Sequence, residues 1–241
     1  MSKKEIRELH LTSKKEIEMQ TKVLGISASP RKGGKVEVLI QEILTSSRLP
    51  HELVRLHDLD IKPCRACNGC RDENACVIKD DWEELRSKIL ESGALVMGSW
   101  AFSGMIDAAT KALMERFWSF RHHHQLTRGK LGAAVVVGVN PELAGNLADM
   151  LLQFMRNNGM NALGRLTAAG ANPCLGCKDS LQSCEYSGVI TQYGLLERIG
   201  AGMYNPIENQ LGALKSARIL GQRIGHKVKG LIARGFVDYV S

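Results

Sequence analysis

Long apolar runs are missing from this sequence of 241 residues. The nearest candidate, residues 131–139, is short and contains glycine, whereas a membrane helix requires about 20 apolar residues. We therefore expect no membrane span. The first residues mix both charges and include no apolar stretch, so the sequence predicts no secretory signal and a cytoplasmic location. Aromatic residues are also scarce, at 5% of the chain.

The common glycine motifs for nucleotides are absent as well. Neither Gly-x-Gly-x-x-Gly nor the Gly-x4-Gly-Lys-Ser/Thr spacing occurs after the first apolar segment. Lys and Arg number 32 against 25 Asp and Glu, a net charge of +7 that favours an anionic partner or reflects a merely basic surface. The basic residues are dispersed and no recognition motif accompanies them, so we expect no nucleic-acid partner.

What is present is an alternation of apolar strands and amphipathic helices. Five alternations of this kind predict a parallel sheet covered on both faces, with a ligand crevice at the carboxyl ends of its strands. We predict a doubly wound, five-stranded, flavodoxin-like α/β domain over residues 22–241, preceded by a helical arm at 1–21. Cysteine-bearing segments at 62–80 and 170–190 interrupt this domain. The predicted strands cover residues 22–27, 52–56, 94–98, 131–138 and 162–168, and the predicted helices cover 36–44, 105–120 and 206–233, with further helices beginning near 81 and 141.

Three loops at the predicted crevice carry ligand-binding chemistry. Residues 27–35 place hydroxyls, cations and glycine amides at a helix N-terminus, which suits a phosphate, although an ordinary polar turn is the alternative. Residues 98–104 carry Trp100 and Phe102, which either wall a planar ring or belong to the core or to a dimer contact. Residues 138–146 would offer amides to a polar ring edge.

Four of the seven cysteines form the run Cys64-x2-Cys67-x2-Cys70-x5-Cys76. Four thiols are the full ligand set of one iron–sulfur cubane, and this spacing is more compact than a tetrahedral zinc usually needs. The run favours an iron–sulfur cluster, with zinc or free thiols as alternatives. Nearby Lys62, Arg65 and Arg71 would offset the charge of a thiolate-bound cluster.

A second group, Cys174-x2-Cys177-x6-Cys184, supplies only three thiols. A metal there would need a fourth ligand, such as Asp179 or Glu185, and a redox-active pair or cysteines without ligand duty are the alternatives. Two other clusters receive simpler interpretations. Three adjacent histidines at 122–124 indicate a loop after a helix, and Asp81, following Asp80, is a good helix cap rather than part of an acid/base pair.

Taken together, these residues resemble the iron–sulfur flavoproteins, a branch of the NADPH-dependent FMN reductase-like proteins with a flavodoxin-like fold. The resemblance covers about residues 22–225, with the compact cysteine run as its specific element. It implies FMN and a [4Fe-4S] cluster on Cys64, Cys67, Cys70 and Cys76. The three thiols of Cys174, Cys177 and Cys184 separately suggest a second iron–sulfur or metal centre, which the resemblance does not imply. The residues it implies for FMN are Ser27, Ser29, Arg31, Gly33, Gly34, Lys35, Trp100, Ala101, Phe102, Ser103, Gly104, Asn140 and Gly145.

The sequence departs from this family where Lys35-Val36 replaces the usual Asn and hydroxyl residue, and the second cysteine group lies outside the family pattern. The resemblance implies an FMN-dependent oxidoreductase that exchanges electrons with a ferredoxin-like donor or acceptor, as a homodimer or homotetramer in which one chain's cluster lies near a neighbour's FMN. One alternative is a specialised reductase that acts on a small substrate at the second cysteine group. The other is a zinc-stapled binding protein without flavin.

Overall fold

A parallel sheet forms the centre of the computed structural model, which describes residues 21–177 and 184–233. Five parallel strands run in the order β2-β1-β3-β5-β6, which is the order 2-1-3-4-5 of flavodoxin-like folds and confirms the predicted class. A sixth strand, β4 (Met105–Ile106), pairs antiparallel with the end of β3. The parallel strands are β1 (Val23–Ser27), β2 (His51–Arg55), β3 (Ala94–Phe102), β5 (Leu131–Gly138) and β6 (Asn161–Ala169).

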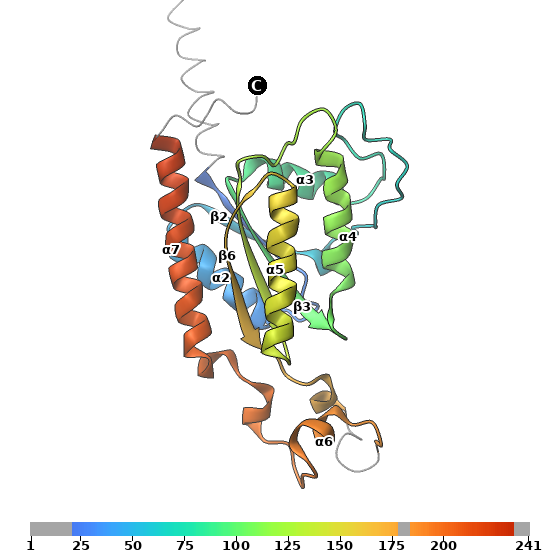
Figure 1. Ribbon diagram of the computed structural model, residues 1–241, viewed down its shortest axis with the longest axis vertical. Coiled ribbons are helices and arrows are strands. Elements are labelled where there is room, and N and C mark those ends of the chain that lie inside the picture. Colours follow the sequence, from blue (N-terminus) through green and yellow to red (C-terminus); the bar gives the residue numbers. More distant parts are fainter. Residues whose placement is uncertain (1–20, 178–183, 234–241) are drawn as a thin grey trace, which may run out of the picture.

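Helices cover the sheet on both faces (Figure 1). Helices α2 (Lys35–Ser47) and α7 (Leu211–Ala233) share one apolar core with the sheet. A second core, on the other face, contains side chains of α3 (Trp82–Glu91), α4 (Ala108–Arg116) and α5 (Pro141–Asn157). All eight residues of β5 are buried, because this central strand is covered on both sides.

The helix predicted for residues 105–120 begins later and ends earlier than expected. Asp107 is the N-cap of α4, where its carboxylate accepts hydrogen bonds from the Thr110 amide at 2.9 Å and from the Ser99 hydroxyl at 2.6 Å. This cap fixes the start of α4, and the chain before it continues β3 and forms β4. After Arg116 the chain tightens into the 3-10 turn η2 (Phe117–Phe120).

The long segment between β6 and α7 leaves the sheet and returns to the same place. The Gln210 side chain accepts the Ala169 amide at 2.8 Å and donates to the Ala169 carbonyl at 3.0 Å, so it closes the base of the excursion. The final helix therefore begins at Leu211 rather than at 206. The short elements of the excursion are η3 (Pro173–Gly176), α6 (Gly188–Tyr193), η4 (Ala201–Tyr204) and η5 (Ile207–Asn209), and η1 (Leu56–Asp58) follows β2.

Two parts of the sequence predictions lie outside the described residues. These are the N-terminal helical arm up to residue 20 and the Asp179 ligand proposed for the second cysteine group. Within residues 21–177 and 184–233, no helix is both long and apolar enough to cross a bilayer.

Candidate cofactor sites

A cavity of about 230 Å³ opens at the carboxyl ends of β1, β3, β5 and β6. This is the edge at which open parallel sheets bind their ligands. Its walls come from four loops far apart in the sequence. The lining residues are Ser29, Pro30, Arg31, Gly34, Lys35, Val36, Trp100, Ala101, Phe102, Val137, Gly138, Val139, Gly170, Ala171 and Pro173.

The loop after β1 has the features of a phosphate site. Its N-cap residue, Gly34, makes no side-chain capping bond, so the first turn of α2 offers its amides to an anion. Ser29 accepts the Arg31 amide on its hydroxyl at 3.3 Å, which bends the loop around that hydroxyl. Gly33 has a φ of 67° and donates its amide to Glu37 at 2.7 Å, which holds the loop against α2.

Trp100 and Phe102 form the aromatic wall of the cavity. Their rings meet edge to face, with centroids 5.2 Å apart. The Trp100 indole Nε1 is buried without a hydrogen-bond partner among the described residues, and buried donors of this kind are rare unless a ligand or water satisfies them. A ring with polar edges, as in a flavin, fits this wall because it offers apolar faces and hydrogen-bond acceptors together.

Seven of the residues predicted for FMN line the cavity, and six lie elsewhere. Ser27 and Gly33 support the loop rather than line the cavity. The Ser27 hydroxyl accepts the Ser29 amide at 3.3 Å, and the Gly33 amide donates to Glu37. Asn140 caps α5 by accepting the Leu143 amide at 3.0 Å. The other three are Ser103 and Gly104, exposed in the turn between β3 and β4, and Gly145, whose Cα faces the Arg165 guanidinium.

The segment after β6 also contributes to the cavity, although no sequence motif predicted this. Gly170, Ala171 and Pro173 complete the cavity wall. Lys35 donates its ammonium to the Tyr204 carbonyl at 2.7 Å, which joins the phosphate loop to the same segment. Burial and the neighbouring Arg31 lower the pKa of Lys35, so two cations crowd a site that has room for an anion.

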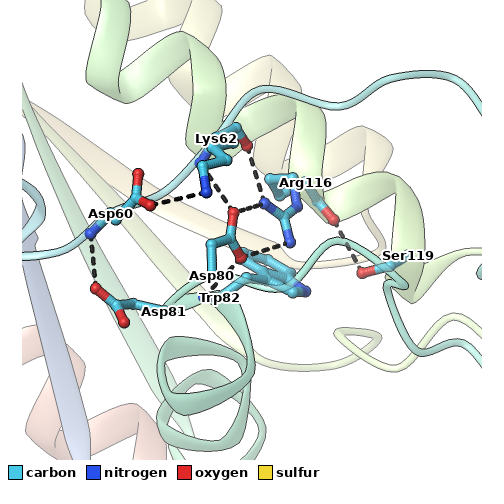
Figure 2. A network of polar contacts seen from close by, with 7 residues as sticks. All are labelled: Asp60, Lys62, Asp80, Asp81, Trp82, Arg116 and Ser119. Carbon is cyan, nitrogen blue, oxygen red and sulfur yellow. Dashed lines mark hydrogen bonds and ion pairs between the residues drawn. The ribbon is translucent and has the colours of Figure 1, made fainter.

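The first cysteine run lies away from this cavity. Residues 62–80, here called the cysteine loop, lie beside the end of α4 that points away from the carboxyl edge of the sheet (Figure 1). Arg116 at that end of α4 joins the two ends of the loop (Figure 2). Its guanidinium donates to the Lys62 carbonyl at 2.9 Å and makes a two-pronged ion pair with Asp80. Asp80 also accepts the Lys62 amide at 3.0 Å.

This ion pair is fully buried, with both side chains 0% exposed. Burial alone would raise the pKa of Asp80, but hydrogen bonds from Arg116 and from the Lys62 and Trp82 amides bring it below the usual value. Burial opposes the charge on Arg116, yet Asp80 and Cys76 raise its pKa. The Arg116 Nε atom has no hydrogen-bond partner in the described structure, and the guanidinium lies near enough to Cys76 for that thiol to raise its pKa.

Lys62 and Arg71, two of the cations predicted to offset the charge of a cluster, pair with neighbouring carboxylates. Lys62 contributes mainly its backbone and pairs its ammonium with Asp60 at 3.0 Å, while Arg71 pairs with the exposed Asp72. Asp80, not Asp81, accepts the amide of Trp82 at the start of α3, because the Asp81 side chain accepts the Asp60 amide instead. The buried cation of this loop is therefore Arg116, which the sequence predicts only as one residue of a helix.

The other three thiols of the cysteine loop affect the pKa of Cys70. Burial raises the pKa of the Cys70 thiol, and Cys76, Cys64 and Cys67 raise it further. The His122 ring lies 3.1 Å from the Cys70 sulfur, and its amide donates to Asn74 at 2.9 Å. Thus the histidine run belongs to the cysteine loop rather than to the cavity. Ala66, Asn68 and Asn74 hold positive φ angles of 52°, 55° and 53°, and such backbone strain concentrates at functional sites.

The four thiols of the cysteine loop could serve as ligands of an iron–sulfur cluster. In the described parts of the chain, no three Cys, His, Asp or Glu side chains converge closely enough to hold one ion, around either cysteine group. A cubane does not require that convergence, because each thiolate binds a different iron.

Comparisons with known proteins agree with this geometry. A model of the NADPH-dependent FMN reductase family matches residues 21–172. An iron–sulfur flavoprotein of Methanocaldococcus jannaschii is 38% identical over 122 residues, which cover 49% of this chain and 63% of that protein. One from Methanosarcina thermophila is 33% identical over 120 residues, covering 48% and 63%. This chain therefore spans less than two thirds of either relative.

An iron–sulfur flavoprotein of Archaeoglobus fulgidus is 30% identical over 142 residues, which cover 57% of this chain and 73% of that protein. Among solved structures, RosB with bound 8-demethyl-8-formylriboflavin-5'-phosphate has a TM-score of 0.64 at 16% identity, covering 88% of this chain and 80% of RosB. The Trp repressor binding protein of Bacillus subtilis has a TM-score of 0.53 at 18% identity, covering 82% and 98%. At these identities the two structures show the shared fold alone. The family model and the curated relatives show more: the chain belongs to the NADPH-dependent FMN reductase family and to its iron–sulfur flavoproteins.

Proposed function

We propose that this protein is an FMN-dependent oxidoreductase that carries a [4Fe-4S] cluster on Cys64, Cys67, Cys70 and Cys76. The observation that carries the proposal is the pairing of two built sites in one chain. One is a phosphate-ready cavity with an aromatic wall, and the other is a four-thiol loop closed by a buried ion pair. The flavin exchanges one or two electrons and the cluster one, so the protein's own task is to position and tune them.

In the cavity, the hydroxyl of Ser29, the Arg31 guanidinium and the first amides of α2 would hold the FMN phosphate. Trp100 and Phe102 would cover the ring and keep water from one side of it. The Trp100 Nε1, which is buried without a partner in the described structure, would gain one if the bound cofactor offers an acceptor. These residues bind and orient the flavin; they hold no proton for transfer.

At the cysteine loop, Arg116 keeps the thiol-bearing chain folded and sets a buried positive charge beside Cys76. That charge would raise the potential of a cluster bound there. His122 adds a ring nitrogen within hydrogen-bond range of the Cys70 sulfur. The electron donor or acceptor in this proposal is a ferredoxin-like carrier, and the net charge of +7 would steer an acidic one.

The separation of the two sites supports an assembly of several copies. Each site carries exposed apolar side chains at its edge: Phe102 and Met105 beside the cavity, and Val77 and Trp118 beside the cysteine loop. A dimer or tetramer that covers these side chains would set the cluster of one copy near the flavin of another. Analytical ultracentrifugation of Val77→Asp and Phe102→Asp variants tests this, with a shift to smaller species expected for both.

The first test is an absorbance spectrum of anaerobically purified protein, with flavin, iron, sulfide and zinc counted per chain. About one FMN and about four irons would support the proposal, and reduced ferredoxin should bleach both chromophores. A colourless protein containing zinc would overturn it in favour of a stapled binding protein. Iron without flavin would support the cluster and overturn the proposed FMN site.

A further inference from the structure

We infer that Cys174 and Cys177 are a redox-active dithiol pair that takes electrons from the flavin of the same chain and passes them to an external disulfide. The inference rests on the proposed function, because it requires FMN in the cavity. It concerns a part of the chain beyond residues 21–172, the range that the family model matches.

The two cysteines lie in one tight turn. The Cys177 amide donates to the Cys174 carbonyl at 3.0 Å, within η3. A turn of this kind holds the first and fourth Cα atoms within about 7 Å, which overlaps the roughly 4.4–6.8 Å that a disulfide spans. In a 3-10 turn these two side chains also lie one above the other. The backbone is therefore already shaped for a disulfide, and both thiols are free here.

The turn stands at the edge of the flavin cavity. Pro173, the residue directly before Cys174, lines that cavity, as do Gly170 and Ala171. The pair thus begins one residue beyond the cavity wall, whereas the cysteine loop lies at the other end of α4 (Figure 1). Of all the cysteines described, those of this turn follow a residue of the cavity wall.

Side-chain hydrogen bonds hold the turn in place. Asn172 accepts the Cys174 amide on its side-chain oxygen at 3.0 Å and donates to the Gly188 carbonyl at 2.9 Å. The Tyr204 hydroxyl donates to the Leu175 carbonyl at 3.1 Å, between the two cysteines. The Tyr204 carbonyl in turn accepts Lys35 of the phosphate loop. A chain of bonds therefore links the cysteine pair to the place where FMN is held.

The two thiols differ in exposure, as exchange chemistry requires. Cys177 is exposed and Cys174 is partly buried. The exposed sulfur can reach a disulfide outside the protein, and the partly buried one can resolve the resulting mixed disulfide. The substrate class that follows is a disulfide on a small molecule or on a protein surface.

The electron balance closes with reduced flavin as the reductant. The Cys174–Cys177 disulfide takes two electrons and two protons, which gives two thiols and oxidised flavin. The Cys177 thiolate then attacks one sulfur of the external disulfide and releases the other as a thiol. Finally the Cys174 thiolate attacks the Cys177 sulfur, which restores the internal disulfide and releases the second thiol.

A metal on this group is the competing interpretation. A single ion or an iron–sulfur cluster here would use Cys184 as a third thiol ligand and would still lack the fourth ligand that such centres usually take. The pair interpretation needs only the two cysteines that the turn already aligns. The Cys184→Ser variant therefore separates the two interpretations, since it removes a metal ligand and leaves the pair.

The test begins with the full-length, FMN-loaded protein in anaerobic dithiothreitol redox buffers, followed by trapping with N-ethylmaleimide and peptide mapping. We expect one two-electron transition that links Cys174 to Cys177, absent in Cys174→Ser and Cys177→Ser and retained in Cys184→Ser. Iron or zinc lost on any of the three substitutions, or no disulfide between the pair at any poise, would overturn the inference.

The second stage measures the link to the flavin. Starting from the oxidised pair, photoreduction of the wild type should consume two more electron equivalents per chain than photoreduction of Cys174→Ser. If the disulfide forms in buffer but consumes no flavin electrons, the inference fails while the proposed function stands. If the protein binds no FMN, both fail, and the flavin count from the first test reveals it.

Discussion

The two cysteine-bearing segments are held by opposite means. The cysteine loop is closed by a charged pair that water does not reach, and it carries strained backbone at three non-glycine residues. The turn with Cys174 and Cys177 is held by neutral hydrogen bonds from Asn172 and Tyr204, with one thiol exposed. Each segment exposes one thiol, Cys67 in the loop and Cys177 in the turn. The two segments therefore differ in what fixes the backbone around the thiols, a buried charged pair in one and neutral hydrogen bonds in the other, rather than in access to solvent.

Replacing single cysteines should give the largest difference between the two segments, in the iron content of the protein. Cys67→Ser should remove the iron of the protein, about four atoms per chain, because a cubane with a missing ligand is not retained well. Cys174→Ser should leave the iron count unchanged. Iron and sulfide analysis of both variants, purified side by side without oxygen, measures this. Equal iron loss in both would show that the segments share one metal centre.

Breaking the buried ion pair should be the next largest effect. Arg116→Met leaves the Asp80 carboxylate buried without its cation, which typically costs about 3–5 kcal/mol of folding free energy. Urea unfolding of the apoprotein gives that value. The matched control is Lys111→Met on the same helix, whose exposed pair with Glu115 should contribute about 0.5 kcal/mol or less. A small effect of Arg116→Met would mean that the loop closes without this pair.

Thiol reactivity should differ by about tenfold or more between Cys177 and Cys70. In iron-free protein at pH 8, iodoacetamide should modify Cys177 faster than Cys70, because Cys70 is buried and its pKa is raised. The Cys70 thiolate forms only at higher pH, so its rate should still be rising where an ordinary thiol has levelled off. Mass spectrometry of timed samples from pH 7 to pH 10 follows both sites. Equal rates at pH 8 would contradict the burial of Cys70.

The smallest effect is expected from Tyr204→Phe. This change removes one hydrogen bond, from the Tyr204 hydroxyl to the Leu175 carbonyl, worth about 1 kcal/mol. Global stability should change little, while amide hydrogen exchange around residues 174–177 should become faster. Exchange in residues 64–76 serves as the internal control and should stay the same. A change in the cysteine loop instead would mean that the segments are coupled.

The features that could be predicted from the sequence are those whose signal lies within one short stretch of residues. Residues 131–138 form a strand with the predicted bounds, because a central strand is apolar on both faces and needs no distant information. Arg116 was missed because its partner, Asp80, stands 36 residues earlier, and in the sequence it is one more charge on a helix. Asp107 was missed as a cap although its bond from the Thr110 amide is local, because the helix was predicted to begin already at 105. Its second bond, from Ser99 in the preceding strand, depends on the fold.

The cofactor cavity shows the same limit. The phosphate loop and the Trp100 wall follow from motifs adjacent to predicted strands, and the structure places both at the cavity. Gly170 and Pro173 follow the last strand without any motif of their own, so only the fold brings them there. The FMN and cluster ligands themselves remain predictions that the experiments above address.

The Gln210 side chain gives the excursion between β6 and α7 a consequence for how this protein can evolve. By bonding both the amide and the carbonyl of Ala169, one amide side chain imitates a neighbouring strand and seals the sheet where the chain departs. The sheet itself can therefore accept changes in the middle of the excursion, because its two ends are joined at Ala169 and Gln210. The flavin cavity sets the limit on such changes, since Gly170, Ala171 and Pro173 line it and Tyr204 binds Lys35 of its phosphate loop.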